Sequence, residues 1–347
     1  MSEKLIDTKV ITYPDPEGMK KAAELIKSGA LVAFPTETVY GLGANALMPD
    51  AAEKVYRAKG RPSDNPLIIH LADARDAEKY CYVTSGFERL AKAFMPGPLT
   101  VVMKKKDIIP STVTGGLDTV AVRIPSQIAA RELISLAGVP IAAPSANLSG
   151  RPSTTSADHV ISDMLGRIDM IIDGGECDIG LESTIVSFCG ENKLKMLRPG
   201  KITLEMLENE GFEVELDKAV TEKLAEGERP AAPGMKYRHY APGAPVTLIE
   251  GDSADRNAFL APLADDKSVA IICFEEDEEI KNASNAYVIG SKNDPEGQAH
   301  RLFSMLRAFD DKEEIKQIYA PLPEKSGIGL AIFNRMLKAS GYTVIKV

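Results

Sequence analysis

The chain has 347 residues, of which 44% are hydrophobic and 26% charged, and its formal net charge at pH 7 is −9. This composition excludes a disordered chain, a collagen and a small disulfide-rich protein, and at about 150 residues per domain the length predicts two domains. The negative charge argues against a protein whose main role is to bind nucleic acid.

Strand and helix signals alternate through the first part of the chain. Apolar residues at helical spacing predict an amphipathic helix over 16–28, and a short apolar run that ends at Pro35 predicts a strand over 30–34. Further helices are expected at 50–58, 86–94, 126–136 and 156–165, and further strands at 67–71, 99–103, 120–124, 141–143, 170–172 and 183–188. This mixture predicts a mostly buried sheet covered by helices.

A proline-rich segment separates the two parts of the chain. Residues 229–245 contain four prolines, which do not fit inside a helix or a central strand, so the segment reads as an extended linker. It also carries aromatic and charged side chains, among them Tyr237 and His239, which a passive spacer does not need. A tether and a segment that touches a ligand are both open readings.

The second part of the chain repeats strand and helix more regularly. Strands are expected at 246–250, 269–274, 286–289 and 315–320, and helices at 253–263, 295–309 and 327–339. This order predicts a small doubly wound parallel domain, and no G-x-G-x-x-G follows its first strand. Most of the negative charge lies here, because residues 206–347 hold 17 Lys and Arg against 25 Asp and Glu.

The chain carries no signal for a membrane or for secretion. Its N-terminus is polar, and no apolar run approaches the roughly 18 residues that a membrane helix needs. The 4 cysteines show no zinc-ligand spacing. We therefore expect a reduced, cytoplasmic protein.

Two loops in the first part have residues suited to an anionic ligand. Hydroxyls, a carboxylate and two glycines, with Thr38 among them, follow a predicted strand directly, although a plain polar turn would look the same. Lys59 and Arg61 follow a helix on a loop stiffened by two prolines, which suits a polyanion such as triphosphate. His70 ends the next strand, where a structural histidine is the alternative.

Three later segments add candidates. Arg123 lies in an apolar strand, so either a buried carboxylate or a ligand carboxylate must pair with it. Residues 140–153 run from a buried strand into a loop rich in hydroxyls and amides, groups that hold phosphate or ribose oxygens. Ser183 opens a strand, and Arg198 follows its hairpin partner, where it reaches either a phosphate or a surface ion pair. Since no Walker, kinase or zinc-protease motif occurs, the residues alone indicate an α/β enzyme that binds an anionic ligand.

Taken in this order, the five segments and the Pro-Gly-Met-Lys-Tyr-Arg-His-Tyr-Ala-Pro linker resemble the YrdC/Sua-type family, the L-threonylcarbamoyladenylate synthases, in its two-domain long form. The resemblance implies a YrdC-like domain with a twisted mixed sheet and flanking helices over 10–205. It also implies a linker over 206–245 that closes the active site as a lid, and a smaller Rossmann-like α/β domain over 246–347.

The resemblance implies a reaction as well. L-Threonine, bicarbonate and ATP would give threonylcarbamoyl-AMP, pyrophosphate and water, with Mg²⁺ bound together with the nucleotide. The product would feed the t6A modification at position 37 of tRNAs that read codons beginning with A, through a separate tRNA threonylcarbamoyltransferase.

The resemblance also implies the residues of the site. Lys59 and Arg61 would hold the phosphates as the catalytic pair. Arg123 would bind the carboxylate of threonine, and Thr38, His70 and Ser183 its other polar groups. The rest of the nucleotide site would comprise Asn65, Thr119, Ala143, Ser145, Asn147, Ser153, Arg198, Tyr237 and His239.

Other functions remain as alternatives. A relative that transfers carbamoyl groups from carbamoyl phosphate would need a zinc-finger framework, for which the chain has no cysteine pattern. A double-stranded RNA-binding protein would need a basic face, which the charge counts do not favour, and weak RNA binding beside an enzymatic role stays open. The second domain could also sense a small ligand, which the sequence neither supports nor excludes.

Overall fold

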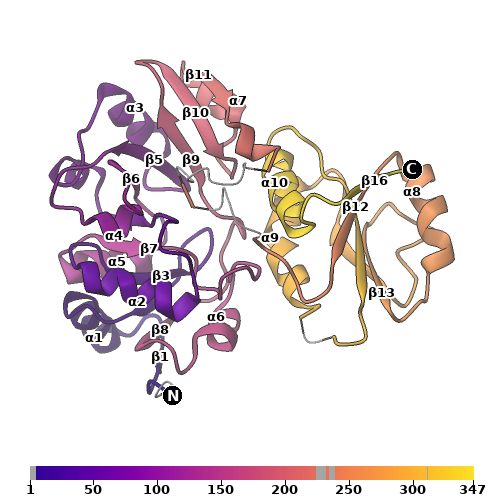
Figure 1. Ribbon diagram of the computed structural model, residues 1–347, viewed down its shortest axis with the longest axis horizontal. Coiled ribbons are helices and arrows are strands. Elements are labelled where there is room, and N and C mark those ends of the chain that lie inside the picture. The colour runs from indigo at the N-terminus through magenta and orange to yellow at the C-terminus, as the bar shows by residue number, and fades with distance from the viewer. Residues whose placement is uncertain (1–4, 224–231, 234–238, 311) are drawn as a thin grey trace. The chain divides into compact units, whose positions relative to one another are not determined.

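The structure, a computed structural model, describes residues 5–223, 232–233, 239–310 and 312–347. The chain divides into two compact units, each with its own sheet (Figure 1). The first unit takes most of the chain up to residue 236. The second takes the chain from residue 237 onward, together with the short segments 150–152 and 179–181 from the middle of the chain.

The first unit is built on an 11-stranded sheet with the strand order β1-β8-β2-β3-β7-β4-β6-β5-β9-β10-β11. Parallel and antiparallel pairs alternate irregularly, as in β4 against β6 (parallel) and β5 against β6 (antiparallel). The strands are β1 (Lys9–Thr12), β2 (Val32–Phe34), β3 (Gly41–Asn45), β4 (Ile68–His70), β5 (Leu99–Lys104), β6 (Thr119–Arg123), β7 (Ile141–Ala143), β8 (Met170–Asp173), β9 (Thr184–Phe188), β10 (Lys193–Arg198) and β11 (Glu213–Leu216).

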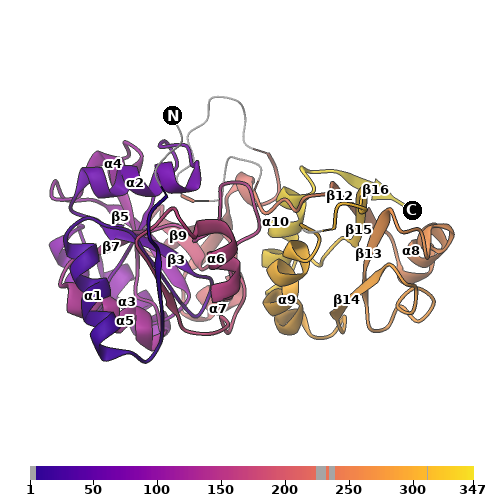
Figure 2. The ribbon, with the colours of Figure 1, turned by 90° about the horizontal axis from the view of Figure 1, so that it is seen from below.

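Helices cover this sheet on both sides. Figure 2 shows α1 and α5 together on one side of the first unit and α2 and α4 on the other. The helices are α1 (Pro16–Lys27), α2 (Pro49–Lys59), α3 (Ser85–Phe94), α4 (Ser111–Thr114), α5 (Ile128–Ala137), α6 (Ala157–Met164) and α7 (Leu204–Asn209), with single 3-10 turns at η1 (Ala74–Lys79) and η2 (Lys218–Val220).

Local sequence explains where these helices begin and end. Asp15 caps α1 by accepting the amide of Gly18 at 3.0 Å, Pro16 stands at the first helical position, and Met19 and Ile26 lie on the buried face. Helix α2 ends at Gly60, which adopts a left-handed conformation with φ 63°. That cap turns the chain out of the helix directly between Lys59 and Arg61.

One segment expected as a loop is a strand. Residues 41–45 form β3, which pairs with β2 and β7 in the middle of the sheet, whereas the sequence predicted a polar turn after Pro35. A Cβ on Gly41 would lie 2.9 Å from the Phe34 ring, and one on Gly43 would lie 2.9 Å from a methyl group of Ile141. The glycines therefore allow this strand to pack closely against its neighbours. Because glycine is typical of turns, the same residues made the segment look like a turn in the sequence.

Part of the segment assigned to the linker has regular secondary structure. Residues 206–216 contain the end of α7 and the strand β11, which pairs in parallel with β10 at the edge of the sheet. Leu207 and Phe212 are buried in the core of the first unit. Exposed glutamates at this edge gave the segment the composition of a linker.

The second unit has a fully parallel five-stranded sheet with the order β14-β13-β15-β12-β16. Helices α9 and α10 lie on one side of it and α8 on the other (Figure 1). The elements are β12 (Val246–Glu250), α8 (Ser253–Leu260), η3 (Ala261–Leu263), β13 (Val269–Phe274), β14 (Ala286–Gly290), α9 (Pro295–Arg307), β15 (Gln317–Pro321), α10 (Gly329–Ala339) and β16 (Val344–Lys346). The predicted fold class, a mixed α/β unit followed by a smaller Rossmann-like one, is confirmed.

Candidate active site

Strand register brings several predicted residues onto one face of the first sheet. His70 pairs with Arg123, and Ile68 pairs with both Ala121 and Ala143. Residues that pair in register lie on the same face of a sheet, and so do alternate residues of one strand. Thr119 and Arg123 therefore lie on the same face as His70 and Ala143. Ser183 joins them, because its hydroxyl lies 2.8 Å from that of Thr100, which pairs with Arg123.

Apolar residues form the floor of this face. Among the described residues, a small cluster is made by Ile68, Val102, Ala121, Ile185, Leu197, Ala219 and Ala232. The first five come from the sheet, whereas Ala219 and Ala232 follow the last strand of the unit. Ala219 of η2 and Ala232, both of which follow the last strand, therefore cover this part of the face.

Arg123 and Glu37 form a buried ion pair at one end of this floor. Arg123 Nη2 lies 2.8 Å from Glu37 Oε1, with side chains only 4% and 5% exposed. The buried carboxylate is thus the alternative that the structure shows for Arg123. Nε and Nη2 of Arg123 make no hydrogen bond of good geometry with any described group, so the guanidinium retains donor capacity.

His70 is a neutral imidazole beside this pair. Burial and the positive charge of Arg123 lower the pKa of His70 to about 3. Its Nδ1 lies 3.2 Å from the carbonyl of Ile68 and 3.3 Å from that of Ile141, so Nδ1 carries the proton. The ring also meets Phe34 edge to face. The Nε2 atom is then the acceptor available at this position.

The loop after α2 carries a buried amide without a partner. Both side-chain atoms of Asn65 are buried, and neither bonds to any atom that the structure describes. The half-buried Arg61 shapes this loop by donating to the carbonyls of Asn65 at 3.4 Å and Pro66 at 3.2 Å. A native buried amide that lacks partners costs about 1–3 kcal/mol, which indicates that a ligand completes it.

Lys59 ties this loop to the one that follows β7. Its side chain is buried, and its ammonium donates to the carbonyl of Ser145 at 2.5 Å and to that of Asn147. The Ser145 hydroxyl in turn bonds to the Asn147 amide oxygen at 2.5 Å. Lys59, Ser145 and Asn147 therefore lie together, with the ammonium engaged by backbone oxygens.

Two further contacts involve carboxylate and guanidinium groups. The hydroxyl of Ser153 donates to Glu182 at 2.5 Å, and both residues are buried. Arg198 donates to the carbonyl of Ser183 at 3.1 Å, to its hydroxyl at 3.2 Å, and to the carbonyl of Pro233 at 3.4 Å. Thr38 is fully buried, with its hydroxyl 2.8 Å from that of Thr36.

Two of the residues predicted for the nucleotide site, Tyr237 and His239, come from the predicted linker. Tyr237 lies outside the described residues. His239 belongs to the second unit, where its ring packs against Tyr240 with centroids 5.6 Å apart.

Sequence reasoning missed Glu37 and Glu182 as members of the site. The charge of Arg123 in an apolar strand required a partner, but only the fold shows that Glu37, 86 positions earlier in the printed sequence, supplies it. Glu182 stands next to Ser183, and nothing in its local pattern distinguishes it from a surface carboxylate.

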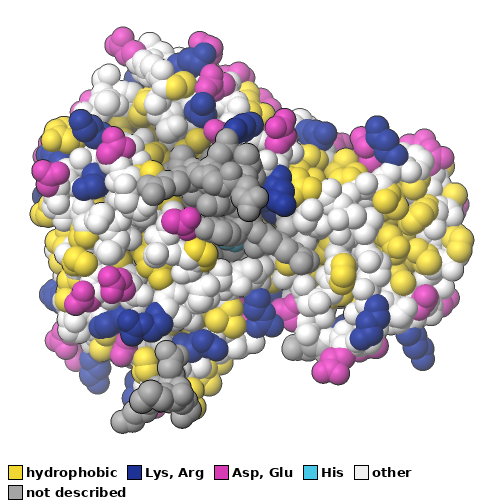
Figure 3. Space-filling view, in the orientation of Figure 1, with side chains coloured by type: hydrophobic (Ala, Val, Ile, Leu, Met, Phe, Trp, Pro, Cys, Tyr) yellow, Lys and Arg dark blue, Asp and Glu magenta, His cyan; other side chains and the backbone are white. Residues whose placement is uncertain are grey.

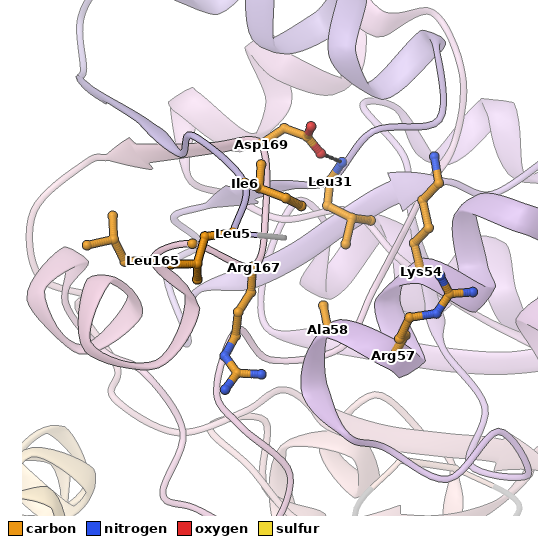
Figure 4. Close-up of a pocket in the computed structure, with 10 residues that line it drawn as sticks. Leu5, Ile6, Leu31, Lys54, Arg57, Ala58, Leu165, Arg167 and Asp169 are labelled. Carbon is orange, nitrogen blue, oxygen red and sulfur yellow. Dashed lines mark hydrogen bonds between the residues drawn. The ribbon is translucent and has the colours of Figure 1, made fainter. Parts of the chain in front are cut away.

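A separate hollow of about 590 Å³ lies elsewhere in the first unit (Figure 4). Leu5, Ile6 and Leu165 line it together with Lys54, Arg57 and Arg167, and none of the predicted site residues does. Figure 3 shows basic and acidic side chains interspersed over the visible face of this unit. A continuous basic field for RNA is therefore not seen on that face.

No metal-binding cluster forms within the described ranges, where no three His, Cys, Asp or Glu side chains converge. In the same ranges, every helix is too short or too polar to cross a membrane.

Two family models match the chain. The one described as "Telomere recombination", for Sua5, YciO and YrdC proteins, matches residues 24–200. The one described as "Threonylcarbamoyl-AMP synthase, C-terminal domain" matches residues 202–341.

Curated relatives and solved structures agree along nearly the whole chain. The threonylcarbamoyl-AMP synthase of Pyrococcus abyssi is 46% identical over 332 residues, covering 94% of this chain and 95% of the relative. That of Bacillus subtilis is 43% identical over 343 residues, covering 98% and 97%. A crystal structure of P. abyssi Sua5 complexed with L-threonine superimposes with a TM-score of 0.89 at 43% identity, covering 98% of this chain and 99% of that one.

Proposed function

The chain belongs to the threonylcarbamoyl-AMP synthase family, and on that premise we propose how its own residues carry out the reaction. The enzyme joins L-threonine, bicarbonate and ATP into threonylcarbamoyl-AMP and releases pyrophosphate, the step that supplies the t6A modification of tRNA. The resemblance seen in the sequence is thereby confirmed at the level of the family and the activity.

Threonine binds at the Arg123 end of the sheet face in this proposal. Arg123 pairs with the carboxylate of threonine through the guanidinium donors that Glu37 leaves without good hydrogen bonds. The neutral His70 accepts from a polar group of the amino acid through Nε2, and Thr38 and Ser183 contact the remaining polar atoms. A relative's structure with L-threonine supports a threonine site in this fold.

ATP extends from there across the apolar floor toward the loop after α2. Arg61, with the charge of Lys59 behind it, faces the phosphates, and the amide of Asn65 gains the partners it lacks. The loop residues Ser145, Asn147 and Ser153 complete the nucleotide site with Thr119, the backbone of Ala143, and Arg198. The unpartnered Asn65 amide is the observation that carries this assignment.

The reaction then depends on how the substrates are positioned more than on a nucleophile supplied by the protein. The amine of threonine adds to CO₂ with loss of a proton, or condenses with bicarbonate with loss of water, to give a carbamate. An oxygen of the carbamate then attacks the α-phosphorus of ATP while pyrophosphate leaves. Negative charge grows on phosphate oxygens, where fixed cations such as Arg61 stabilise it. We propose that Mg²⁺ enters together with the ATP phosphates, where it would offset part of their negative charge.

Two proposals concern the surroundings of the reaction. The product passes to a separate tRNA threonylcarbamoyltransferase, since a mixed anhydride of this kind hydrolyses easily and must be consumed nearby. Ala232 and Pro233 act as a cover that excludes water from the nucleotide, which the burial of Ala232 among the residues of the floor supports.

Pyrophosphate release from ATP tests the proposal, measured with threonine and bicarbonate each present or omitted. Release should require both, and threonine should be preferred over serine. ATP turnover that ignores threonine would contradict the proposed substrate, and Arg61→Ala with wild-type release would remove Arg61 from the site. Arg57→Ala is the matched control, because Arg57 is an exposed arginine in the last turn of α2, shortly before Arg61.

A further inference from the structure

The second unit contains a cavity that the synthase reaction does not use. Its volume is about 590 Å³, and it lies where four parallel strands end, lined by Ser253 after β12, Phe274 of β13, Lys292 after β14 and Pro323 after β15. The chain leaves β13 toward one edge of the sheet and leaves β15 toward the other. In open α/β sheets, ligands bind at such a point of divergence, beyond the carboxyl ends of the strands.

Two cations line this cavity and share one buried carboxylate. Asp277 is 3% exposed, and its Oδ1 lies 3.8 Å from Arg256 Nη2 and 3.4 Å from Lys292 Nζ. That oxygen makes no hydrogen bond among the residues described, whereas Oδ2 accepts the amide of Phe274 at 2.9 Å. One carboxylate thus holds two cations in place beside the cavity.

Two acidic residues line the cavity itself, Asp252 and Glu324. The carboxylate of Asp252 is occupied at the start of α8, where it accepts the amides of Ala254 at 2.9 Å and Asp255 at 3.0 Å. It therefore caps that helix and does not neutralise Arg256 or Lys292 by direct contact.

Backbone donors complete the cavity at the start of α10. The amides of Gly327, Ile328 and Gly329 donate no hydrogen bond to any part of the chain that the structure describes, and no side chain caps this helix. Gly327 has φ +51°, and a Cβ on Gly329 would lie 2.9 Å from the carbonyl of Glu324. Both glycines are thus needed to present these amides, which favour an anion at the positive end of the helix.

We propose that this cavity binds a small phosphorylated molecule of mononucleotide size. Its phosphate lies between the amides of residues 327–329 and the side chains of Arg256 and Lys292, and charge-assisted hydrogen bonds hold it. Phe274 forms an apolar wall under the rest of the ligand; its ring centroid already lies 6.0 Å from Arg256 and 5.6 Å from Lys292. The volume falls within the range of sites for molecules of that size.

Hydrogen-deuterium exchange of the full chain tests this site apart from the catalytic one. AMP, pyrophosphate and inorganic phosphate serve as separate probes. At least one should protect the peptides that span 252–256, 291–298 and 323–330, which all belong to the second unit. Protection by inorganic phosphate alone would identify the bare anion as the ligand, and stronger protection by AMP would identify a nucleotide.

Two variants decide whether the cations hold the ligand. In a chain carrying Arg256→Gln and Lys292→Gln, the affinity measured from this local protection should fall at least tenfold. Lys346→Gln, an exposed lysine of the same unit, should leave it unchanged. No protection by any probe in the wild-type chain would overturn the proposal, whether or not the double variant folds. Equal protection in the wild type and a folded double variant would also overturn it.

Discussion

At the scale of single residues, the site contains two kinds of buried polar group: those for which the structure describes a hydrogen-bond partner, and those for which it describes none. Glu182 receives the hydroxyl of Ser153, and Arg198 is held by Ser183, so these side chains are placed before any ligand arrives. Asn65 is different, because its amide is buried without a partner, while Arg61 fixes the backbone around it. Groups of the first kind give rigidity, and a group of the second kind reports where a ligand must bind.

This contrast predicts opposite effects for two asparagines. Asn65→Ala should abolish threonine-dependent pyrophosphate release and change the free energy of unfolding by less than about 1 kcal/mol, because it removes an unsatisfied amide. The control is Asn45→Ala, which removes an amide that accepts from Leu47 at 3.0 Å. It should cost about 1 kcal/mol and spare turnover. Urea unfolding and pyrophosphate release are measured on both variants. An Asn65→Ala protein that is destabilised and still active would contradict this prediction.

His70 predicts a pH dependence of stability. Its pKa is about 3 in the folded protein against an ordinary value of 6.5, so the unfolded chain binds a proton that the folded chain excludes. The neutral His70 therefore makes its full contribution to the free energy of unfolding above pH 6.5, and this contribution is lost as the pH falls toward 3. Between pH 7 and pH 5, the wild type should lose about 2 kcal/mol more than His70→Gln.

Urea unfolding at the two pH values measures this difference. Carboxylates titrate equally in both proteins, so the difference isolates the imidazole. His300→Gln, on a helix of the second unit, serves as the histidine control. Parallel pH profiles for the wild type and His70→Gln would show that the folded protein tolerates a charged ring at this position.

At the scale of elements, the sequence predicted the helices and strands that local patterns determine. It missed the features that depend on how strands pair. The helix at 16–28 and the strand at 141–143 were expected within one residue, because capping and apolar spacing are local signals. The strand β3 was missed, since its glycines are explained only by the neighbouring Phe34 and Ile141. The shared face of Thr119, Arg123 and His70 likewise depends on register, which single strands do not encode.

The covering segment supports a prediction at this scale. Ala232 is fully buried on the apolar floor, so Ala232→Asp would place a charge there and drive residue 232 from the face. The KM for ATP should rise about tenfold, equivalent to ~1.4 kcal/mol, and ATP hydrolysis without threonine should increase. Ala232→Ser, which preserves size and burial, is the control. Unchanged kinetics in a folded Ala232→Asp enzyme would reduce the segment to a tether.

At the scale of the whole molecule, the two units are not simply successive in the chain. The second unit includes residues 150–152 and 179–181, and each of these segments lies beside a site residue in the sequence. Pro152 directly precedes Ser153, and Leu181 directly precedes Glu182. Ser153 and Glu182 bond to each other at 2.5 Å. The position of this pair in the first unit is therefore linked through the chain to the packing of the second.

That link predicts a remote effect on catalysis. Arg307 of α9 donates to the carbonyl of Pro152 at 2.6 Å, and Asp310 pairs with Arg151 at 3.0 Å. A chain with Arg307→Gln and Asp310→Asn should lose about tenfold in kcat/KM for ATP, ~1.4 kcal/mol, because the segment before Ser153 loses its anchors. Arg301→Gln, in the same helix but bonded to Ile289, should keep wild-type kinetics. If the folded double variant matched the wild type in kcat/KM, the second unit would hold these segments without positioning the site.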